Sequence, residues 1–498
     1  MTKAAVIGAG FGGLALAIRL QSAGVATTLI EARDKPGGRA YAWERATDAG
    51  TFTFDAGPTV ITDPDCLREL WKLSGRDMAD DVTLLPVDPF YRLMWPDGTS
   101  FDYSNDEAAL ARQIGALNPQ DVEGYKAFLR YSEGVYREGY ERLGAVPFLD
   151  FGAMVKAAPA LARYQAWRSV YGVVASHIQN EHLREALSFH TLLVGGNPFT
   201  TSAIYALIHK LEKSGGVWFA KGGTHALIRA MVTQFERLGG TLRLGDAVAH
   251  IDTLGDRATG VTTRSGWHDS FDAVASNADV VHSYRDLLDG NARAGRVARS
   301  LERKRFSPSL FVVHFGVRGS FSGVPHHTIL FGPRYRELLT DIYEHGVLAD
   351  DFSLYIHHPT VTDPSLAPEG HSTFYALAPV PHLGKLPIDW DEVGPIYARR
   401  IMEALDARLL PGLRERLVTS FYYAPPDFAR DLNAHLGSAF SLEPLLTQSA
   451  WFRVHNRDDV IPNLYFTGAG THPGAGIPGV VGSAKATAGL MLDDLRGP

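Results

Sequence analysis

The chain has 498 residues, a formal net charge of −7 and a hydrophobic fraction of 45%. This length suits two or three folded domains. The acidic balance excludes the strongly basic surface of a nucleic-acid-binding protein, so we expect no nucleic-acid partner. Cys66 is the single cysteine, which excludes an internal disulfide and a cysteine-based metal or iron–sulfur site and suits a reducing compartment.

The first apolar run begins at Ala4, which leaves no room before it for the charged and apolar regions of a secretory leader. No stretch reaches the roughly 18–20 consecutive apolar residues that span a bilayer. We therefore expect a cytoplasmic protein that touches a membrane only as a peripheral or monotopic protein.

A glycine-rich turn follows this apolar run, which covers residues 4–7, and leads into a helical pattern. Gly8, Gly10 and Gly13 have the G-x-G-x-x-G spacing of a dinucleotide-binding turn. Its glycines permit a tight turn, close approach of a pyrophosphate and close helix packing. A second predicted strand ends at Glu31, whose carboxylate would accept hydrogen bonds from ribose hydroxyls. The whole unit predicts a Rossmann-like domain.

The rest of the chain predicts further modules inserted into this domain. Residues 63–215 are mostly helical in pattern, residues 217–275 return to strands and glycine turns, and residues 300–440 alternate strands with helical patterns. The predicted domains are a discontinuous dinucleotide-binding domain at 1–75, 216–300 and 441–498, a sheet-based, membrane-contacting substrate domain at 76–110 and 301–440, and a helical insertion at 111–215.

Two clusters of charged or titratable residues have more than one interpretation. The arginine run at 293–305 is either a foot on an anionic membrane or a solvated helix face, and the sequence favours neither. Histidine pairs at 326–327 and 357–358 invite a metal interpretation. Adjacent residues of a strand point to opposite faces, so we expect no metal site.

A second glycine-rich loop lies near the C-terminus, between a predicted strand that ends near Phe466 and a helical pattern that opens at Val480. Because side chains are mostly absent from such a loop, its backbone N–H groups can approach a flat ring system. A helix N-terminus aimed at that ring would stabilise negative charge on it.

These motifs together resemble one family. The C-terminal loop at 463–484, the turn Lys35-Pro36-Gly37-Gly38-Arg39 and the segment Phe54-Asp55-Ala56-Gly57-Pro58-Thr59 closely resemble the bacterial-type phytoene desaturases. These form the carotenoid branch of the FAD-dependent amine-oxidase-like flavoproteins. The resemblance implies an α/β fold in which a discontinuous Rossmann-like FAD-binding domain is joined to a sheet-based substrate domain and a helical, membrane-associated part. Without the first motif, Arg39 would be interpreted as an exposed turn charge.

The resemblance also implies a set of FAD-binding residues, which come from both ends of the chain. They are Gly8, Ala9, Gly10, Phe11, Gly12, Gly13, Glu31, Ala32, Arg33, Gly38, Arg39, Gly57, Pro58, Thr59, Val248, Gly470, Thr471, Gly479 and Val480.

By the same resemblance, the expected activity is the conversion of phytoene to lycopene through successive desaturations. Partners would be phytoene, its partly desaturated intermediates, the inner face of the cell membrane, and oxygen or a quinone as electron acceptor. Each step would send a hydride to flavin N5 and release a proton. The proton acceptor could be a carboxylate, His472 or water, and a structural hydrogen bond is an equally good account of His472.

Other functions share some of these features. An NAD-dependent dehydrogenase would use the first motif but not the other two, and an amine oxidase would present an aromatic cage that we cannot identify in the sequence. A carotenoid isomerase would bind FAD without adding double bonds, and a carotenoid or lipid carrier would not need two flavin motifs.

An amphipathic stretch provides one candidate for membrane contact. It consists of Phe331, Tyr335, Leu338 and Leu339, beside Arg334 and Arg336. An internal helix is the competing interpretation, and this segment alone slightly favours it.

Overall fold

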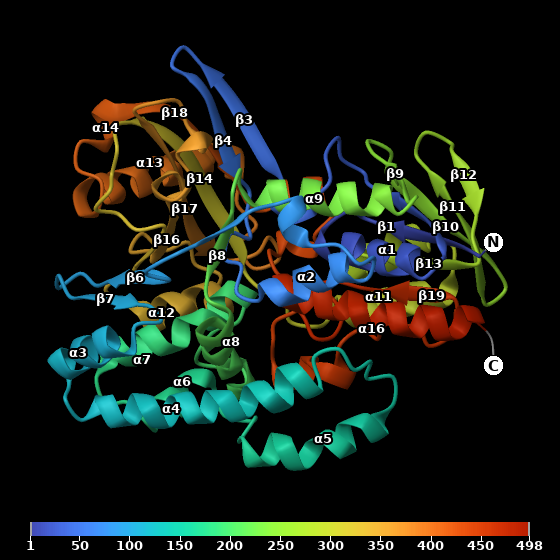
Figure 1. The fold of residues 1–498 in the computed structure, drawn as a ribbon, viewed down its shortest axis with the longest axis horizontal. Helices are drawn as coiled ribbons and strands as arrows, with labels where there is room; N and C mark the ends of the chain where they lie inside the picture. The colour runs from blue at the N-terminus through green and yellow to red at the C-terminus, as the bar shows by residue number, and fades with distance from the viewer. Residues whose placement is uncertain (1, 497–498) are drawn as a thin grey trace.

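Two sheets at opposite ends organise residues 2–496, which a computed structural model describes (Figure 1). A parallel sheet with its helices forms one end, here named the parallel-sheet lobe, on the right of Figure 1. A larger mixed sheet forms the mixed-sheet lobe on the left, and a layer of helices lies beneath both. This arrangement confirms the expected α/β class with a Rossmann-like sheet and a second, sheet-based part.

The parallel-sheet lobe is built from strands that lie far apart in the sequence. Its strands follow the order β19-β13-β1-β2-β9, and all neighbours are parallel. They are β1 (Lys3–Ile7), β2 (Ala26–Ile30), β9 (Thr241–Arg243), β13 (Ala273–Ser276) and β19 (Leu464–Phe466). A Rossmann-like sheet therefore closes only when the two ends of the chain meet.

Both faces of this sheet are covered because β1 is apolar on both sides. Ala4 and Val6 pack into one core with the helices of that face, whereas Ala5 and Ile7 pack into a second core with a small antiparallel sheet. The first face carries α1 (Phe11–Ser22), α2 (Pro64–Lys72), α9 (Thr224–Arg237) and α16 (Ile477–Arg496). The second carries β10 (Val248–Leu254), β11 (Arg257–Thr263), β12 (His268–Ser270), α10 (Val280–His282) and α11 (Ala292–Leu301).

The mixed-sheet lobe has the strand order β18-β14-β17-β16-β15-β6-β7, with β15 and β6 as its one parallel pair. The strands are β6 (Tyr91–Met94), β7 (Ser100–Tyr103), β14 (Ser309–Arg318), β15 (His327–Leu330), β16 (Leu354–His357), β17 (His371–Val380) and β18 (Leu417–Tyr423). Alternate residues of β14, such as Phe311 and Phe315, pack against α13 (Trp390–Arg408) on one face. The opposite face of the mixed sheet lies toward the interior of the molecule.

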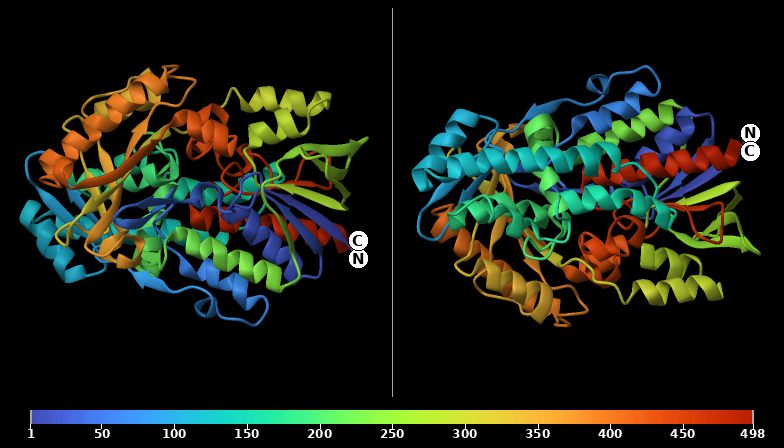
Figure 2. Two further views of the ribbon diagram at one scale, coloured as in Figure 1. Left: turned by 90° about the horizontal axis from the view of Figure 1, so that it is seen from above. Right: turned by 90° about the horizontal axis from the view of Figure 1, so that it is seen from below.

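The helices of residues 107–215 form the layer beneath the two sheets (Figure 1). They are α3 (Glu107–Leu117), α4 (Asp121–Tyr136), α5 (Phe151–Arg163), α6 (Val170–Val174), α7 (Glu181–Ser188) and α8 (Leu207–Gly215). Seen from below, α4 and α5 lie across the near face of the molecule (Figure 2). Two small antiparallel pairs join the lobes: β3 (Ala42–Thr47) with β4 (Gly50–Asp55), and β5 (Leu84–Pro86) with β8 (Trp218–Ala220). The remaining helices are α12 (Tyr335–Thr340), α14 (Leu413–Arg416) and α15 (Pro425–Leu432).

The prediction that the amphipathic stretch contacts a membrane is wrong, because its apolar side chains face inward. Phe331, Tyr335, Leu338 and Leu339 are all buried in one core with the helical layer. Phe331 stacks on Trp95 with ring centroids 5.0 Å apart. The internal-helix interpretation holds for this segment.

Candidate functional site

A large cavity of about 550 Å³ runs from the parallel-sheet lobe toward the helical layer and the mixed sheet. This is within the usual range for a small-molecule or cofactor site. One arm is lined by the glycine turns of the parallel-sheet lobe, and we name it the nucleotide arm. The other, named the apolar arm, is lined by residues of the helical layer and the mixed sheet, including Leu192, Leu193, Ile208, Ile329, Phe331 and Leu354.

The first glycine turn lies at the carboxyl end of β1 and opens α1. Gly8, Gly10, Phe11 and Gly12 line the nucleotide arm. Gly13 does not line it and has a packing role, since a Cβ there would lie 1.9 Å from the carbonyl oxygen of Gly8. The turn therefore presents the free N–H groups of a helix N-terminus, which suits an anion such as a pyrophosphate.

Glu31, at the end of β2, is buried against this turn. One carboxylate oxygen accepts a hydrogen bond from the backbone N–H of Ala9 at 2.8 Å, and the other accepts from Arg33 N–H at 3.0 Å. Burial raises the pKa of Glu31, and these N–H groups oppose that shift. Ala32 and Arg33 line the nucleotide arm beside it, and Val248 of β10 does so too.

Arg39 is enclosed rather than exposed. Its Nε donates to the carbonyl of Ala439 at 2.5 Å and its Nη2 to that of Ser438 at 3.4 Å. Burial lowers the pKa of the guanidinium, and nearby Asp279 opposes that shift. Since Gly38 and Arg39 both line the cavity, the interpretation of Arg39 as an exposed turn charge is excluded.

The segment after β4 joins the two arms of the cavity. Gly57, Pro58 and Thr59 line it, and Gly57 has a φ of +135° with open space where a Cβ would project. A flat ligand could therefore approach this backbone closely. The Thr59 hydroxyl contacts the hydroxyl of Tyr355 at 3.0 Å and that of Tyr375 at 2.8 Å.

The C-terminal loop completes the cavity opposite these turns. Gly479 and Val480, in the first turn of α16, line it. Gly470 and Thr471 do not: Gly470 packs on Val280, and the buried Thr471 hydroxyl lies 2.6 Å from that of Ser483. The predicted residues of the two chain ends are thus brought to one cavity, except that Ala9, Gly13, Gly470 and Thr471 lie behind its wall.

His472 lines the cavity with a ring nitrogen already used. Its Nε2–H donates to the carbonyl of Leu143 at 2.8 Å, while Nδ1 is buried without a protein partner. Burial lowers the pKa of His472 to about 4. The neutral ring therefore ties the C-terminal loop to the helical layer.

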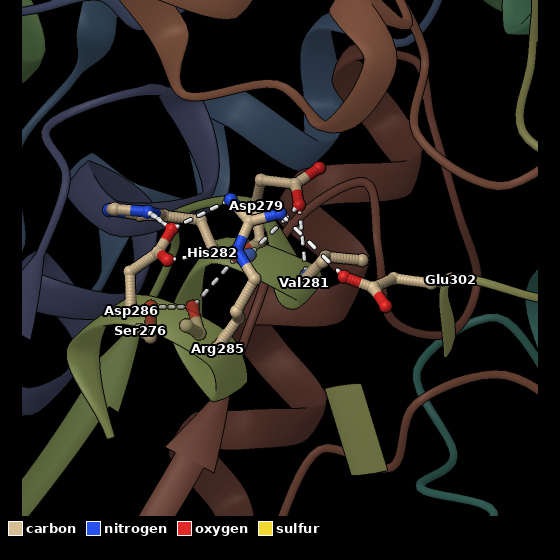
Figure 3. Close-up of polar contacts among 8 residues, drawn as sticks. Ser276, Asp279, Val281, His282, Arg285, Asp286 and Glu302 are labelled. Atoms are coloured by element: carbon tan, nitrogen blue, oxygen red, sulfur yellow. Dashed lines mark hydrogen bonds and ion pairs between the residues drawn. The ribbon is translucent and has the colours of Figure 1, made fainter. Parts of the chain in front are cut away.

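Two cavity residues that the sequence did not predict, Asn277 and Asp279, follow the end of β13. Both line the cavity. One oxygen of Asp279 caps α10 by accepting from the N–H groups of Val281 and His282, and its Oδ2 is buried without a partner (Figure 3). The available signal was their place at the carboxyl end of a parallel strand, where ligands bind in such sheets.

These features fit a flavin dinucleotide. The glycine turns leave space for a backbone to approach a ligand, Gly57 has room above it, and Asp279 offers an unpartnered acceptor to a ligand hydroxyl.

The histidine pairs are buried together, with His326 Nε2 and His357 Nε2 3.1 Å apart. Within residues 2–496, the structure shows no group of three or more side chains that could hold a metal ion.

The comparisons with known proteins agree with this geometry. The family model described as flavin containing amine oxidoreductase matches residues 11–492. A lycopene-forming phytoene desaturase of Paracoccus sp. is 64% identical over 99% of this chain and 97% of its own length. One from Pseudescherichia vulneris is 60% identical over the full length of both chains.

A putrescine oxidase structure has the same fold, with a TM-score of 0.63 at 16% identity, covering 99% of each chain. At such low identity, the likeness shows only that the two proteins share a fold. The family match and the relatives of 60% identity or more show the family, because they extend over nearly the whole chain. The chain belongs to the flavin-containing amine oxidoreductases and, within them, to the phytoene desaturases, with FAD as its cofactor.

Proposed function

We propose that this protein converts phytoene to lycopene by successive FAD-dependent desaturations. The observation that carries the proposal is one continuous cavity that joins the nucleotide arm to the apolar arm at Gly57–Thr59. Relatives that share about 60% of the sequence are named for this reaction. A hydrocarbon has no polar group to recognise, so binding must come from apolar burial, which the apolar arm provides.

We propose the residues of the two glycine-rich chain ends as the FAD-binding set. Gly8 to Gly12 would face the pyrophosphate, while Arg39, Gly57 and Gly479 would surround the flavin half. When bound, FAD supplies a two-electron acceptor for a hydride. The protein holds the polyene within reach, excludes water and accepts one proton for each double bond that forms.

A membrane surface is the proposed source of the substrate, and α5 is the proposed contact. Phe151 and Val155 are 55% and 59% exposed on its outer face. On its inner face Met154 and Ala157 line the cavity, so α5 separates the apolar arm from the outside. Phe151 packs on Trp451 with ring centroids 5.2 Å apart.

Charge and position add to this proposal. Lys156 and Arg163 are exposed on α5, where they would attract anionic lipid headgroups. No helix within residues 2–496 combines the length and the apolar character needed to cross a bilayer. We therefore propose a monotopic contact on the inner face of the cell membrane, with oxygen or a quinone as electron acceptor.

The activity test uses the FAD-loaded protein and phytoene in anionic phospholipid vesicles, with oxygen, with a quinone or with neither. We expect the absorption spectrum of lycopene to develop only with an acceptor. An isomerised product with no added double bonds would overturn the proposal in favour of an isomerase. A colourless protein that takes up no FAD would overturn it altogether.

The membrane test uses the double variant Phe151→Glu/Val155→Glu and the control Leu254→Glu, which changes a side chain 78% exposed on β10 of the parallel-sheet lobe. We expect the double variant to stop floating with vesicles while it retains FAD absorbance, and the control to float like the unmodified protein. Equal flotation of all three would refute α5 as the contact.

A further inference from the structure

One fully buried carboxylate lines the cavity away from the nucleotide arm. Glu212, on α8, has an exposed fraction of 0% and lines the cavity. Its Oε1 accepts a hydrogen bond from the Tyr91 hydroxyl at 2.7 Å, whereas Oε2 is buried without a hydrogen-bond partner. The side chain is therefore held in place by one oxygen and left open at the other.

The other cavity-lining carboxylates of residues 2–496 are bonded through both oxygens, paired with a cation or, like Asp279, only partly buried. Glu31 binds backbone N–H groups beside the glycine turn and Asp279 caps α10. Glu138 is paired with Arg142 and Asp431 with Arg430. Glu212 alone among the five combines complete burial with a free oxygen.

The groups around Glu212 leave it without a fixed cationic partner. His190 Nε2 lies 3.2 Å from Oε2, and both ring nitrogens of His190 lack a hydrogen-bond partner. His209 is kept neutral, since its Nε2–H donates to the carbonyl of Leu187 and burial holds its pKa well below the ordinary value. The Lys213 ammonium is turned away and donates to Ser104 O at 2.7 Å.

Contacts through neighbouring residues link Glu212 to the segment that joins the two arms. Gly215, three residues on along α8, packs so tightly that a Cβ there would lie 2.2 Å from the carbonyl oxygen of Thr62. A second route of contacts runs through side chains. The Tyr91 ring lies 5.7 Å from that of His327, and His327 Nδ1 lies 2.7 Å from the Tyr355 hydroxyl, which contacts Thr59.

Burying a carboxylate without a cation is unfavourable, and a hydrocarbon ligand gains nothing from it. A proton-releasing reaction explains why the group is there. We infer that Glu212 is the proton acceptor of the desaturation, with Tyr91 as the residue that positions it. This inference rests on the proposed function and deepens it.

The step balances as follows. FAD, when bound, would supply the acceptor for a hydride, that is, for the hydrogen of one substrate C–H bond together with its bonding electron pair. The neighbouring C–H bond gives its electron pair to the new C=C bond, and its proton passes to Oε2 of Glu212. The hydride and this proton together supply the two hydrogens that oxygen or a quinone finally takes up. His190 lies close enough to share the proton.

The test compares Glu212→Gln with Glu212→Asp and with the control Glu123→Gln, which changes an exposed carboxylate on α4 that is paired with Lys126 and lies outside the cavity lining. We expect Glu212→Gln to retain FAD absorbance, Tm and KM while kcat falls about 100-fold or more, as for loss of a general base. Glu212→Asp should recover part of kcat, and the control should keep it. A kcat of Glu212→Gln within about threefold of the unmodified enzyme would overturn the inference.

A spectroscopic readout separates proton transfer from a structural role. In an anaerobic single turnover, the infrared difference spectrum of the unmodified holoenzyme should gain a carboxylic-acid C=O band that is absent in Glu212→Gln. A carboxylate that stays ionised through turnover would overturn the inference. If Glu212→Gln does not fold, Tyr91→Phe provides the same test. It should shift the pH profile of kcat, and an unchanged profile would count against the assignment. Lycopene formation by the unmodified enzyme in the same assay shows separately that the proposed function holds.

Discussion

The hydroxyl groups of Thr59 and Tyr375 lie 2.8 Å apart and share a hydrogen bond, although 316 positions separate the two residues in the sequence. Thr59 belongs to the segment that follows β4, and Tyr375 lies in the middle of β17. This contact fixes the joining segment of the cavity to the mixed sheet. The geometry of the nucleotide arm therefore depends on the other lobe.

Removal of this contact gives the first prediction. Tyr375→Phe leaves the buried Thr59 hydroxyl with Tyr355 alone, and we expect a loss of about 1 kcal/mol in the free energy of unfolding and weaker FAD binding. Tyr343→Phe is the matched control, because that buried hydroxyl lines the same cavity and has no partner. Urea unfolding and FAD titration measure both effects. Equal losses in the two variants would contradict the role of the contact.

The packing of Gly13 gives the second prediction. Gly13→Ala would place a Cβ 1.9 Å from the carbonyl of Gly8, so the strand and helix of the glycine turn must separate. We expect loss of FAD and a lower Tm. Gly489→Ala on α16, where the added Cβ meets nothing within 4 Å, should be neutral or stabilise by up to about 1 kcal/mol. Retention of FAD by Gly13→Ala would refute this account.

The buried carboxyl of Asp55 gives a pH-dependent prediction. It lies at the N-terminus of α9, and burial raises its pKa to about 7, against the opposing effects of the Thr224 and His225 N–H groups and of Arg229, while Asp363 raises it further. Between about pH 4 and pH 7 the folded protein keeps this proton and the unfolded chain has lost it. Stability should therefore fall as the pH rises through that window, by at most about 4 kcal/mol.

The variant Asp55→Asn isolates that effect. Because Glu443, whose pKa burial also raises to about 7, is unchanged in the variant, the difference in Tm between the two proteins reports Asp55 alone. We expect the variant to gain relative stability between about pH 4 and pH 7. Parallel Tm curves over that interval would show that Asp55 does not titrate there.

His472 gives the fourth prediction. Its Nε2–H donates to Leu143 O and its pKa is lowered to about 4, so the ring stays neutral at physiological pH. We expect His472→Gln, whose amide can donate the same hydrogen bond, to keep kcat within a few-fold and to leave the pH profile unchanged. A loss of about 100-fold with intact FAD absorbance would instead make His472 a catalytic base.

The sequence predicts the parallel-sheet lobe well because its signals are local. The apolar run of β1, the glycines after it and Glu31 stand within about one βαβ unit, where spacing alone determines the geometry. The domain limits and the individual FAD contacts stay predictions. The sequence does not reveal Tyr355, Tyr375 or Glu212, because they meet only through the register of distant strands and the packing of α8.

The error over the segment from Phe331 to Leu339 has a related cause. An amphipathic pattern shows that one face is buried but not what covers it. Here Trp95 of the preceding hairpin covers Phe331, and Arg336 lies over the Phe199 ring at 3.8 Å. Two of the exposed large apolar side chains, Phe151 and Val155, lie on α5. Arg293, Arg296 and Arg299 of α11 and Arg303, just after it, are exposed. This exposure fits both interpretations of the arginine run.

The strand order of the parallel-sheet lobe has a consequence for biosynthesis. On the side away from β2, β1 pairs with β13, and β13 pairs in turn with β19. The last of these strands therefore leaves the ribosome more than 400 residues after the first. Until then, the nascent polypeptide exposes an unpaired sheet edge and an incomplete cofactor pocket. Its maturation must wait for long-range closure, a slow event. Ample FAD at that moment would stabilise the closed form by mass action. The concentration of FAD during synthesis should therefore affect how much of the newly made enzyme reaches that form.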